Sequence, residues 1–209
     1  MPEKEETFVL GVDLDGTVAD FYGGIRLIAA EWLGKKIEEL TEEVQYGLPE
    51  WGFGDGPHEH RYGDLHRFAV TQRSLFTNLK PFPGAPQALR RLSRDRVLIR
   101  IITHRLFISQ FHQLAVQQTI EWLDRHGIPY RDLCFMEKKT AVDADLYIED
   151  KPENVTKLRE AALPTIVFTN STNKGKAEPP RADNWEQVEV LVHEEIERWK
   201  ANPKRKPHA

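Results

Sequence analysis

At 209 residues the chain is longer than a typical domain of roughly 100 to 150 residues, so we expect one main core with an inserted subdomain. Its hydrophobic and charged fractions of 40% and 30% exclude a chain that is disordered throughout, and its net charge of -4 argues against binding of nucleic-acid polymers. A single cysteine excludes an intramolecular disulfide framework, and no apolar run approaches the roughly 18 residues of a membrane span. We therefore expect a cytoplasmic protein that binds no membrane.

The first predicted strand covers residues 8–12, a short apolar run that stops at the segment DLDGT (residues 13–17). Gly16 permits a tight turn there, so the run is interpreted as a buried central strand. The following stretch, residues 24–80, is far longer than the few residues of an ordinary connection between a strand and a helix. It begins with a helical pattern at residues 25–33 and is predicted to form a small helical cap, called the cap segment below.

From residue 81 onwards, short apolar runs alternate with helical patterns. The predicted strands are residues 97–102, 132–135, 146–148 and 165–168, and the predicted helices are residues 85–94, 109–126, 152–162 and 183–200. This alternation predicts an α/β fold with a three-layer, Rossmann-like parallel sheet and the cap inserted after the first strand. We expect a core at residues 1–23 and 81–201, the cap at residues 24–80, and a disordered basic tail at residues 202–209.

Polar side chains follow several of these predicted strands where each strand ends. Because the carboxyl ends of parallel strands meet at one edge of a sheet, we expect these side chains to share one site. They are Asp13 and Asp15 after the first strand, Thr103 after the second, Lys138 and Lys139 after the third, and Glu149 and Asp150 after the fourth. Carboxylates bind a hard cation through oxygen, and Lys and Thr donate hydrogen bonds to a phosphoryl group. Magnesium suits these oxygen ligands better than zinc.

The spacing of Asp13 and Asp15 predicts two catalytic roles. A carboxylate is already ionised at neutral pH, so Asp13 can attack phosphorus without a separate base. Asp15 lies two residues further and can reach the leaving-group oxygen once Gly16 turns the chain. The same group can then activate the water that hydrolyses the aspartyl phosphate. We therefore expect a phosphomonoester hydrolase with Asp13 as the nucleophile and Asp15 as the general acid and base.

These residues resemble the motifs of the haloacid dehalogenase (HAD) superfamily of phosphatases. The segment VDLDGTV (residues 12–18) is similar to the first motif, Thr103 to the second, Lys139 to the third and Asp150 to the fourth. The resemblance implies that magnesium is held by Asp13, Asp150 and the main-chain carbonyl of Asp15. It also implies that Thr103 and Lys139 contact the phosphate, and we add His104, the residue after Thr103, to this phosphate-binding set. Lys138 is the alternative to Lys139, and the role of Glu149 stays open.

Most of the chain resembles a narrower family, the 5'(3')-deoxyribonucleotidases. The similar segments are residues 13–21, 75–85, 139–140, 144–152, 168–169 and 182–185. In that family aromatic side chains at the cap interface hold the base, which implies that Phe21 and Phe76 line the substrate pocket. The resemblance also suggests a homodimer. The chain departs from the family at DLDGT, where the family has DMDGV, and at His104-Arg105, where the family commonly has Ser-Pro.

The favoured function is hydrolysis of nucleoside monophosphates. A HAD phosphatase for another small phosphate, such as a sugar phosphate, is the first alternative, because the motifs specify phosphoryl chemistry better than the leaving group. A phosphate-sensing module without turnover is the second. His58, His60 and His66 lie in a Gly-rich stretch without cysteines or a standard zinc-ligand spacing, so a hydrated cap surface is favoured over a zinc site.

Overall fold

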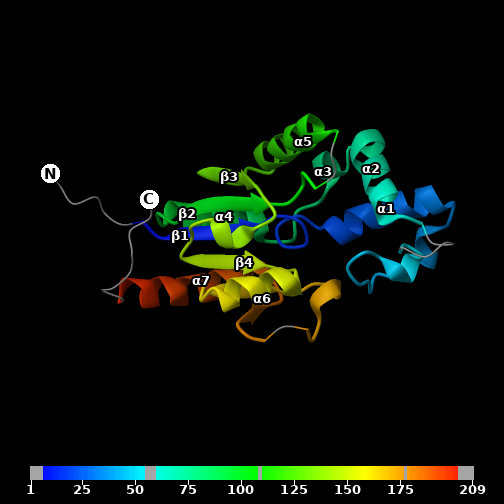
Figure 1. The fold of residues 1–209 in the computed structure, drawn as a ribbon. Helices are drawn as coiled ribbons and strands as arrows, with labels where there is room; N and C mark the ends of the chain where they lie inside the picture. Colours follow the sequence, from blue (N-terminus) through cyan, green and yellow to red (C-terminus); the bar gives the residue numbers. More distant parts are fainter. Residues whose placement is uncertain (1–6, 55–59, 108–109, 177, 202–209) are drawn as a thin grey trace.

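The computed structural model describes residues 7–54, 60–107, 110–176 and 178–201, and the predicted basic tail at residues 202–209 lies outside them. A six-stranded sheet forms the centre of the molecule, and its strand order is β3-β2-β1-β4-β5-β6, with every neighbouring pair parallel (Figure 1). The strands are β1 (Val9–Asp13), β2 (Leu98–Thr103), β3 (Asp132–Phe135), β4 (Leu146–Glu149), β5 (Thr165–Phe168) and β6 (Arg181–Ala182). The predicted parallel α/β sheet is therefore confirmed. The two-residue strand β6 was not predicted, because so short a run carries no periodicity.

Helices cover both faces of this sheet, as the burial of every residue of β1 requires. Leu10 and Val12 belong to a large hydrophobic cluster shared with α4 (Ala85–Arg94), α5 (His112–Arg125) and α7 (Trp185–Lys200). Val9 belongs to a smaller cluster that includes Leu158 of α6 (Pro152–Glu160). Since successive strand residues point to opposite faces, these two clusters are the two interfaces of a three-layer fold. In the described ranges, no helix is long and apolar enough to cross a membrane.

The cap segment lies beyond the carboxyl end of β1 (Figure 1). Its helices are α1 (Phe21–Leu33), α2 (Tyr62–Arg73) and α3 (Leu75–Asn78), with two short 3-10 helices, η1 (Ile37–Glu39) and η2 (Pro49–Trp51), between α1 and α2. The two stretches of chain that connect the cap segment to the sheet lie side by side. The Asp20 amide donates to the Lys80 carbonyl at 2.8 Å, and the Phe82 amide donates to the Val18 carbonyl at 2.8 Å. The division into core and cap domains stays a prediction.

Helix α5 of the core holds the backbone of the cap segment in place. The Trp122 indole donates to the Leu79 carbonyl at 2.7 Å, and Gln118 both accepts from the Phe76 amide at 3.2 Å and donates to the Val70 carbonyl at 2.9 Å. Trp122 and Gln118 are buried. A buried polar group without a partner is costly, so these bonds fix where α2 and α3 lie relative to the sheet.

Replacing Trp122 with Phe should therefore destabilise the protein more than an ordinary Trp-to-Phe change. The variant leaves the Leu79 carbonyl without its buried donor and leaves a small void, so we expect a loss of about 2 to 3 kcal/mol in the free energy of unfolding. Trp32, which is 37% exposed on α1, provides the matched control, and Trp32→Phe should cost less than about 1 kcal/mol. Urea unfolding of both variants measures the difference, and equal losses would contradict this role for Trp122.

Candidate active site

The turn after β1 brings the first motif against the carboxyl end of β4. Gly16 has φ +86°, and its amide donates to the Ala19 carbonyl at 2.9 Å. A Cβ atom at this position would lie 2.3 Å from Oδ2 of Asp150, which is closer than the Cβ atoms of real side chains approach other atoms. Gly16 is thus required twice, once by its left-handed conformation and once by the approach of Asp150. Thr17 completes the turn, and its hydroxyl donates to Oδ2 of Asp13 at 3.2 Å.

Lys139 links the ends of β1 and β4. It begins the short 3-10 helix η3 (Lys139–Ala141), is 6% exposed, and its Nζ donates to Oδ1 of Asp13 and to Oε2 of Glu149, the latter at 2.5 Å. The other carboxylate oxygen of Glu149 accepts from the amides of Asp150 at 3.2 Å and Lys151 at 3.0 Å. The structure therefore brings Lys139 into the site, whereas Lys138 is exposed and not among the residues that line the cavity described below.

Asp150 is held by two asparagines that the sequence alone did not single out. The Asn170 side chain donates to Oδ2 of Asp150 at 2.7 Å and to the Gly16 carbonyl at 3.0 Å, and the Asn173 side chain donates to the Asp150 carbonyl at 2.8 Å. Both asparagines lie at the short 3-10 helix η4 (Ser171–Asn173) after β5 and are buried. Their position after β5 could have indicated a place in the site, because β5 neighbours β4 and ends at the same edge of the sheet.

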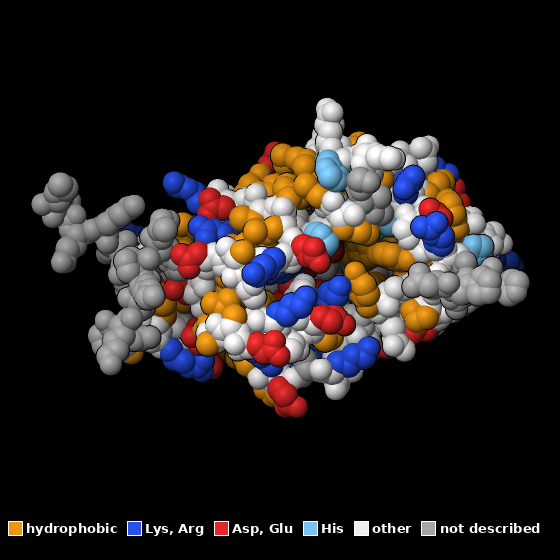
Figure 2. Space-filling view, in the orientation of Figure 1, with side chains coloured by type: hydrophobic (Ala, Val, Ile, Leu, Met, Phe, Trp, Pro, Cys, Tyr) orange, Lys and Arg blue, Asp and Glu red, His pale blue; other side chains and the backbone are white. Residues whose placement is uncertain are grey.

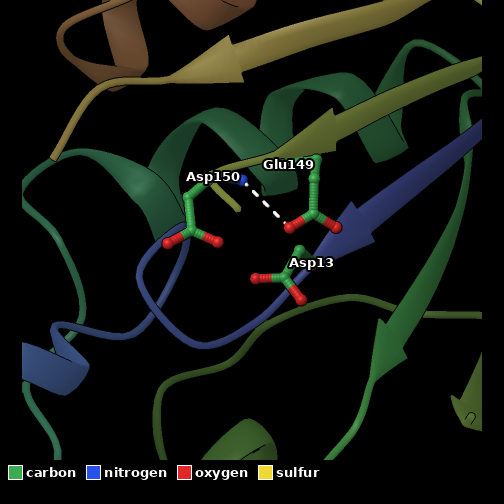
Figure 3. A group of neighbouring side chains, drawn as sticks. All are labelled: Asp13, Glu149 and Asp150. Atoms are coloured by element: carbon green, nitrogen blue, oxygen red, sulfur yellow. Dashed lines mark hydrogen bonds between the residues drawn. The ribbon is translucent and has the colours of Figure 1, made fainter. Parts of the chain in front are cut away.

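Asp13, Glu149 and Asp150 form a buried acidic cluster. Their side chains point toward one another from the ends of β1 and β4 (Figure 3), and one carboxylate oxygen from each lies within 4.8 Å of the others. Three carboxylates face a single buried lysine, so in their ionised forms they carry more negative charge than this lysine balances. Oxygen ligands in this arrangement are compatible with a divalent metal ion.

The pKa values of these groups follow from burial first and from their mutual charges second. Burial raises the pKa of Asp13 to about 7, with Glu149 adding to the rise and Lys139 opposing it. Burial and the charges of Asp13 and Glu149 also raise the pKa of Asp150 well above its usual range. Burial acts to lower the pKa of Lys139, but its two carboxylate partners outweigh burial and the pKa lies above its usual range. Lys139 is therefore a fixed positive charge.

Asp15 is bound by a buried arginine. Nε of Arg105 donates to Oδ2 of Asp15 at 2.8 Å and Nη2 donates to Oδ1 at 2.6 Å, which is the bidentate geometry of a strong pair. The Arg105 side chain is 1% exposed, against 24% for Asp15. Its remaining contacts are the Thr119 hydroxyl at 3.1 Å and the Phe76 ring, whose centroid lies 4.1 Å from the guanidinium carbon. The sequence marked Arg105 only as a departure from the family pattern.

The cavity beside these residues has a volume of about 440 Å³ and brings the remaining predicted site residues together. Thr103 and Phe76 are fully buried in its wall, Phe21 is largely buried, and His104 is exposed at its edge. Tyr22 of α1 and, from the cap segment, Tyr46, Tyr62 and His66 also line the cavity. Figure 2 shows hydrophobic side chains gathered in a hollow, with charged side chains on the side of the sheet.

One feature of this cavity differs from the sequence-based expectation. His66, expected on a hydrated cap surface, is 2% exposed and lines the cavity, so that expectation is wrong. The helical period of α2 places it on the same face as Leu65, Ala69 and Val70, and the sequence therefore held a signal for its burial. The cap also reaches back to the core at the rim, where Nζ of Lys151 lies 3.8 Å from the centroid of the Tyr46 ring.

Comparison with known proteins finds nucleotidases of similar sequence and a hydrolase of similar fold. Residues 7–197 match the family model of the "5' nucleotidase, deoxy (Pyrimidine), cytosolic type C protein". A protein of Chlorobaculum tepidum named "Putative 5'(3')-deoxyribonucleotidase" is 56% identical over 189 residues, which cover 90% of this chain and 92% of that protein. The mitochondrial 5'(3')-deoxyribonucleotidase of Mus musculus is 24% identical, with 85% and 83% covered. A HAD-superfamily hydrolase structure from Geobacter sulfurreducens, 13% identical, shares the fold with a TM-score of 0.52 and covers 92% of this chain and 100% of that chain.

The pair of Asp15 and Arg105 is expected to behave as one energetic unit. Arg105→Met leaves Asp15 without its partner, Asp15→Asn leaves a buried guanidinium without its counter-charge, and the double variant does neither. The loss of stability in the double variant should therefore fall short of the sum of the single losses by about 1 to 2 kcal/mol. Chemical unfolding of the four proteins measures this coupling.

The exposed pair of Lys200 and Glu197, separated by 2.8 Å on α7, is the matched control for that cycle. Its coupling should be below about 0.5 kcal/mol, because solvent screens exposed ion pairs. A coupling between Asp15 and Arg105 no larger than that of the control pair would contradict the proposed unit.

Proposed function

Since the chain belongs to the family of the cytosolic type C 5' nucleotidases, deoxy (pyrimidine), within the HAD superfamily, we propose that it hydrolyses nucleoside monophosphates through an aspartyl phosphate on Asp13. The observation that carries this proposal is the position of Asp13. Its carboxylate lies at the wall of a nucleotide-sized cavity, with one oxygen on Lys139 and the other on the Thr17 hydroxyl. These two contacts hold the carboxylate in one orientation.

In the first half-reaction an Asp13 oxygen attacks phosphorus and the ester bond to the leaving alcohol breaks. Lys139 lies between Asp13 and Glu149, so its charge stays fixed and can stabilise the negative oxygens of the phosphoryl group in the transition state. Thr103 and His104 line the same cavity and supply further hydrogen-bonding groups. Glu149 acts through Lys139, because both of its oxygens are already bonded to Lys139 and to main-chain amides.

Asp15 carries the proton in both half-reactions. Asp15 first takes up a proton from solvent as substrate binding breaks one of its Arg105 bonds, and it donates that proton to the leaving alcohol. It then takes a proton from the water that hydrolyses the aspartyl phosphate. Both of its oxygens accept hydrogen bonds from Arg105 in the substrate-free protein, so the leaving oxygen has to replace one of these bonds. Arg105 thereby fixes the position of the Asp15 carboxylate before the substrate binds.

Magnesium fits the acidic cluster. The residues that would hold it are Asp13, Asp150 and the main-chain carbonyl of Asp15, and the supporting observation is the buried negative charge that Lys139 alone does not balance. When bound, the ion neutralises the charge that builds up on the phosphoryl oxygens. Asn170 and Asn173 keep Asp150 in place for this role. Glu149 belongs to the cluster but serves as a support rather than a ligand.

The aromatic wall supports a substrate with a flat base. Phe21 and Phe76 line the cavity, and stacking on such rings is a common way to hold a nucleobase. The names of the related proteins point to a deoxyribonucleotide. The family resemblance also suggests a homodimer, and the description of the matching family model as cytosolic supports a cytoplasmic location.

A screen of phosphate monoesters tests the proposed function. In magnesium-containing buffer, deoxynucleoside monophosphates should be hydrolysed with a kcat/KM at least about tenfold above that of sugar phosphates. Asp13→Asn should lower kcat at least about 10³-fold, because it removes the nucleophile, whereas the control Asp95→Asn at the exposed end of α4 should not. A preference for sugar phosphates would favour the alternative substrate class, and full activity of Asp13→Asn would overturn the mechanism.

Magnesium binding should weaken as the pH falls. Burial raises the pKa of Asp13 to about 7, so below this pH a proton competes with the cation for the carboxylate. The apparent affinity for magnesium should drop by roughly eightfold between pH 7.5 and pH 6, as measured by calorimetric titration. Asp13→Asn should bind magnesium weakly and with a shallower pH dependence. An affinity that is constant over this range would contradict the assigned ligand.

A further inference from the structure

His66 is a buried polar group that the mechanism does not use. It lies on α2, is 2% exposed, and lines the active-site cavity. Its Nδ1 atom has no hydrogen-bond partner, and across the described ranges it is the one buried side-chain nitrogen or oxygen atom in this condition. Buried polar atoms in native proteins are nearly always paired, so an unpaired one in a binding cavity points to a partner that arrives with the ligand.

Aromatic rings surround this imidazole. The ring centroids of Phe107, Phe76, Tyr62 and Phe21 lie 4.6, 5.6, 6.0 and 6.2 Å from that of His66. Rings of this kind offer stacking surface to a flat ligand but few hydrogen bonds in the ligand plane. His66 is thus a polar ring with an unpaired nitrogen among these aromatic side chains, and Lys139, Asp13 and Asp15 line the same cavity.

The imidazole is neutral at physiological pH. Burial lowers the pKa of His66 to about 4, and Arg105 adds to this effect while Asp15 opposes it. A neutral imidazole has one nitrogen that donates and one that accepts, so it is suited to an uncharged polar partner and unsuited to a phosphate. The polar edge of a nucleobase carries such uncharged donors and acceptors in the plane of the ring, whereas a sugar phosphate carries no flat ring to stack beside it.

We propose that His66 is a specificity-determining residue that binds the polar edge of the substrate nucleobase through Nδ1. This inference rests on the proposed nucleotidase function and assigns a role to a residue outside the phosphoryl-transfer machinery. His66 selects nucleotides over phosphate esters that lack a base, and the aromatic rings around it hold the base in the plane where Nδ1 reaches its edge.

The test compares two substrates in several variants. Deoxyuridine monophosphate carries a base, and deoxyribose 5-phosphate carries the same sugar and phosphate without one, so the ratio of their kcat/KM values measures base recognition alone. His66→Phe keeps a flat ring but removes the polar nitrogen and should lower this ratio about tenfold. His66→Asn puts a polar atom near the position of Nδ1 and should stay within about threefold of the wild-type ratio.

His193→Asn, a change at an exposed histidine of α7, is the matched control and should keep the wild-type ratio. An unchanged ratio in His66→Phe, or equal losses in His66→Phe and His66→Asn, would overturn the inference while leaving the nucleotidase function intact. A wild-type protein with no preference for the nucleotide would overturn the proposed function first and this inference with it.

A measurement on the wild-type protein covers the case in which the variants fold poorly. With ¹⁵N-labelled histidine, the Nδ1 resonance of His66 should shift when deoxyuridine is added and should not shift with deoxyribose. A resonance that deoxyuridine leaves unmoved would overturn the inference without any substitution.

Discussion

The burial of three carboxylates around one lysine is the constraint on which the site depends. Asp13, Glu149 and Asp150 are buried together, and among the described residues Lys139 is the one positive side chain that donates to them, to Asp13 and to Glu149. Like charges in such a place cost free energy unless the fold holds them there and a cation offsets them. The hydrogen bonds from Asn170, Asn173 and the amides after β4 meet the first condition. The cluster is compatible with a divalent ion that supplies the offsetting positive charge.

The parallel sheet makes this arrangement possible because it brings residues far apart in the sequence to one edge. Asp13 and Asp150 come from adjacent strands, and the register of β1 with β4 sets their separation. Gly16 lets the backbone pass close to Asp150, since any side chain there would overlap the Asp150 carboxylate. The catalytic motif therefore depends on a residue that carries no chemistry of its own.

Helix α5 connects the reaction end of the cavity to its substrate end. Thr119 of α5 bonds to Arg105, Arg105 holds Asp15 and packs on the Phe76 ring, and Gln118 accepts from the Phe76 amide. The position of the proton carrier and the position of an aromatic wall residue are thus set by the same buried contacts. Arg105 lies where the chain departs from the motifs of its family, and His66 lies outside those motifs.

The residues proposed to carry phosphoryl chemistry could be predicted from the sequence because they lie in short motifs at strand ends, where local pattern and strand order are enough. That reasoning predicts the parallel sheet, the convergence of Asp13, Asp15, Thr103, Lys139 and Asp150, and an aromatic role for Phe21 and Phe76. The partners of these groups come from long-range packing. Arg105 meets Asp15 across 90 positions, and Asn170 meets Gly16 across 154. No local pattern encodes such contacts, so only the tertiary structure shows Arg105 on the proton carrier, the asparagines behind Asp150, and an unpaired His66 in the cavity.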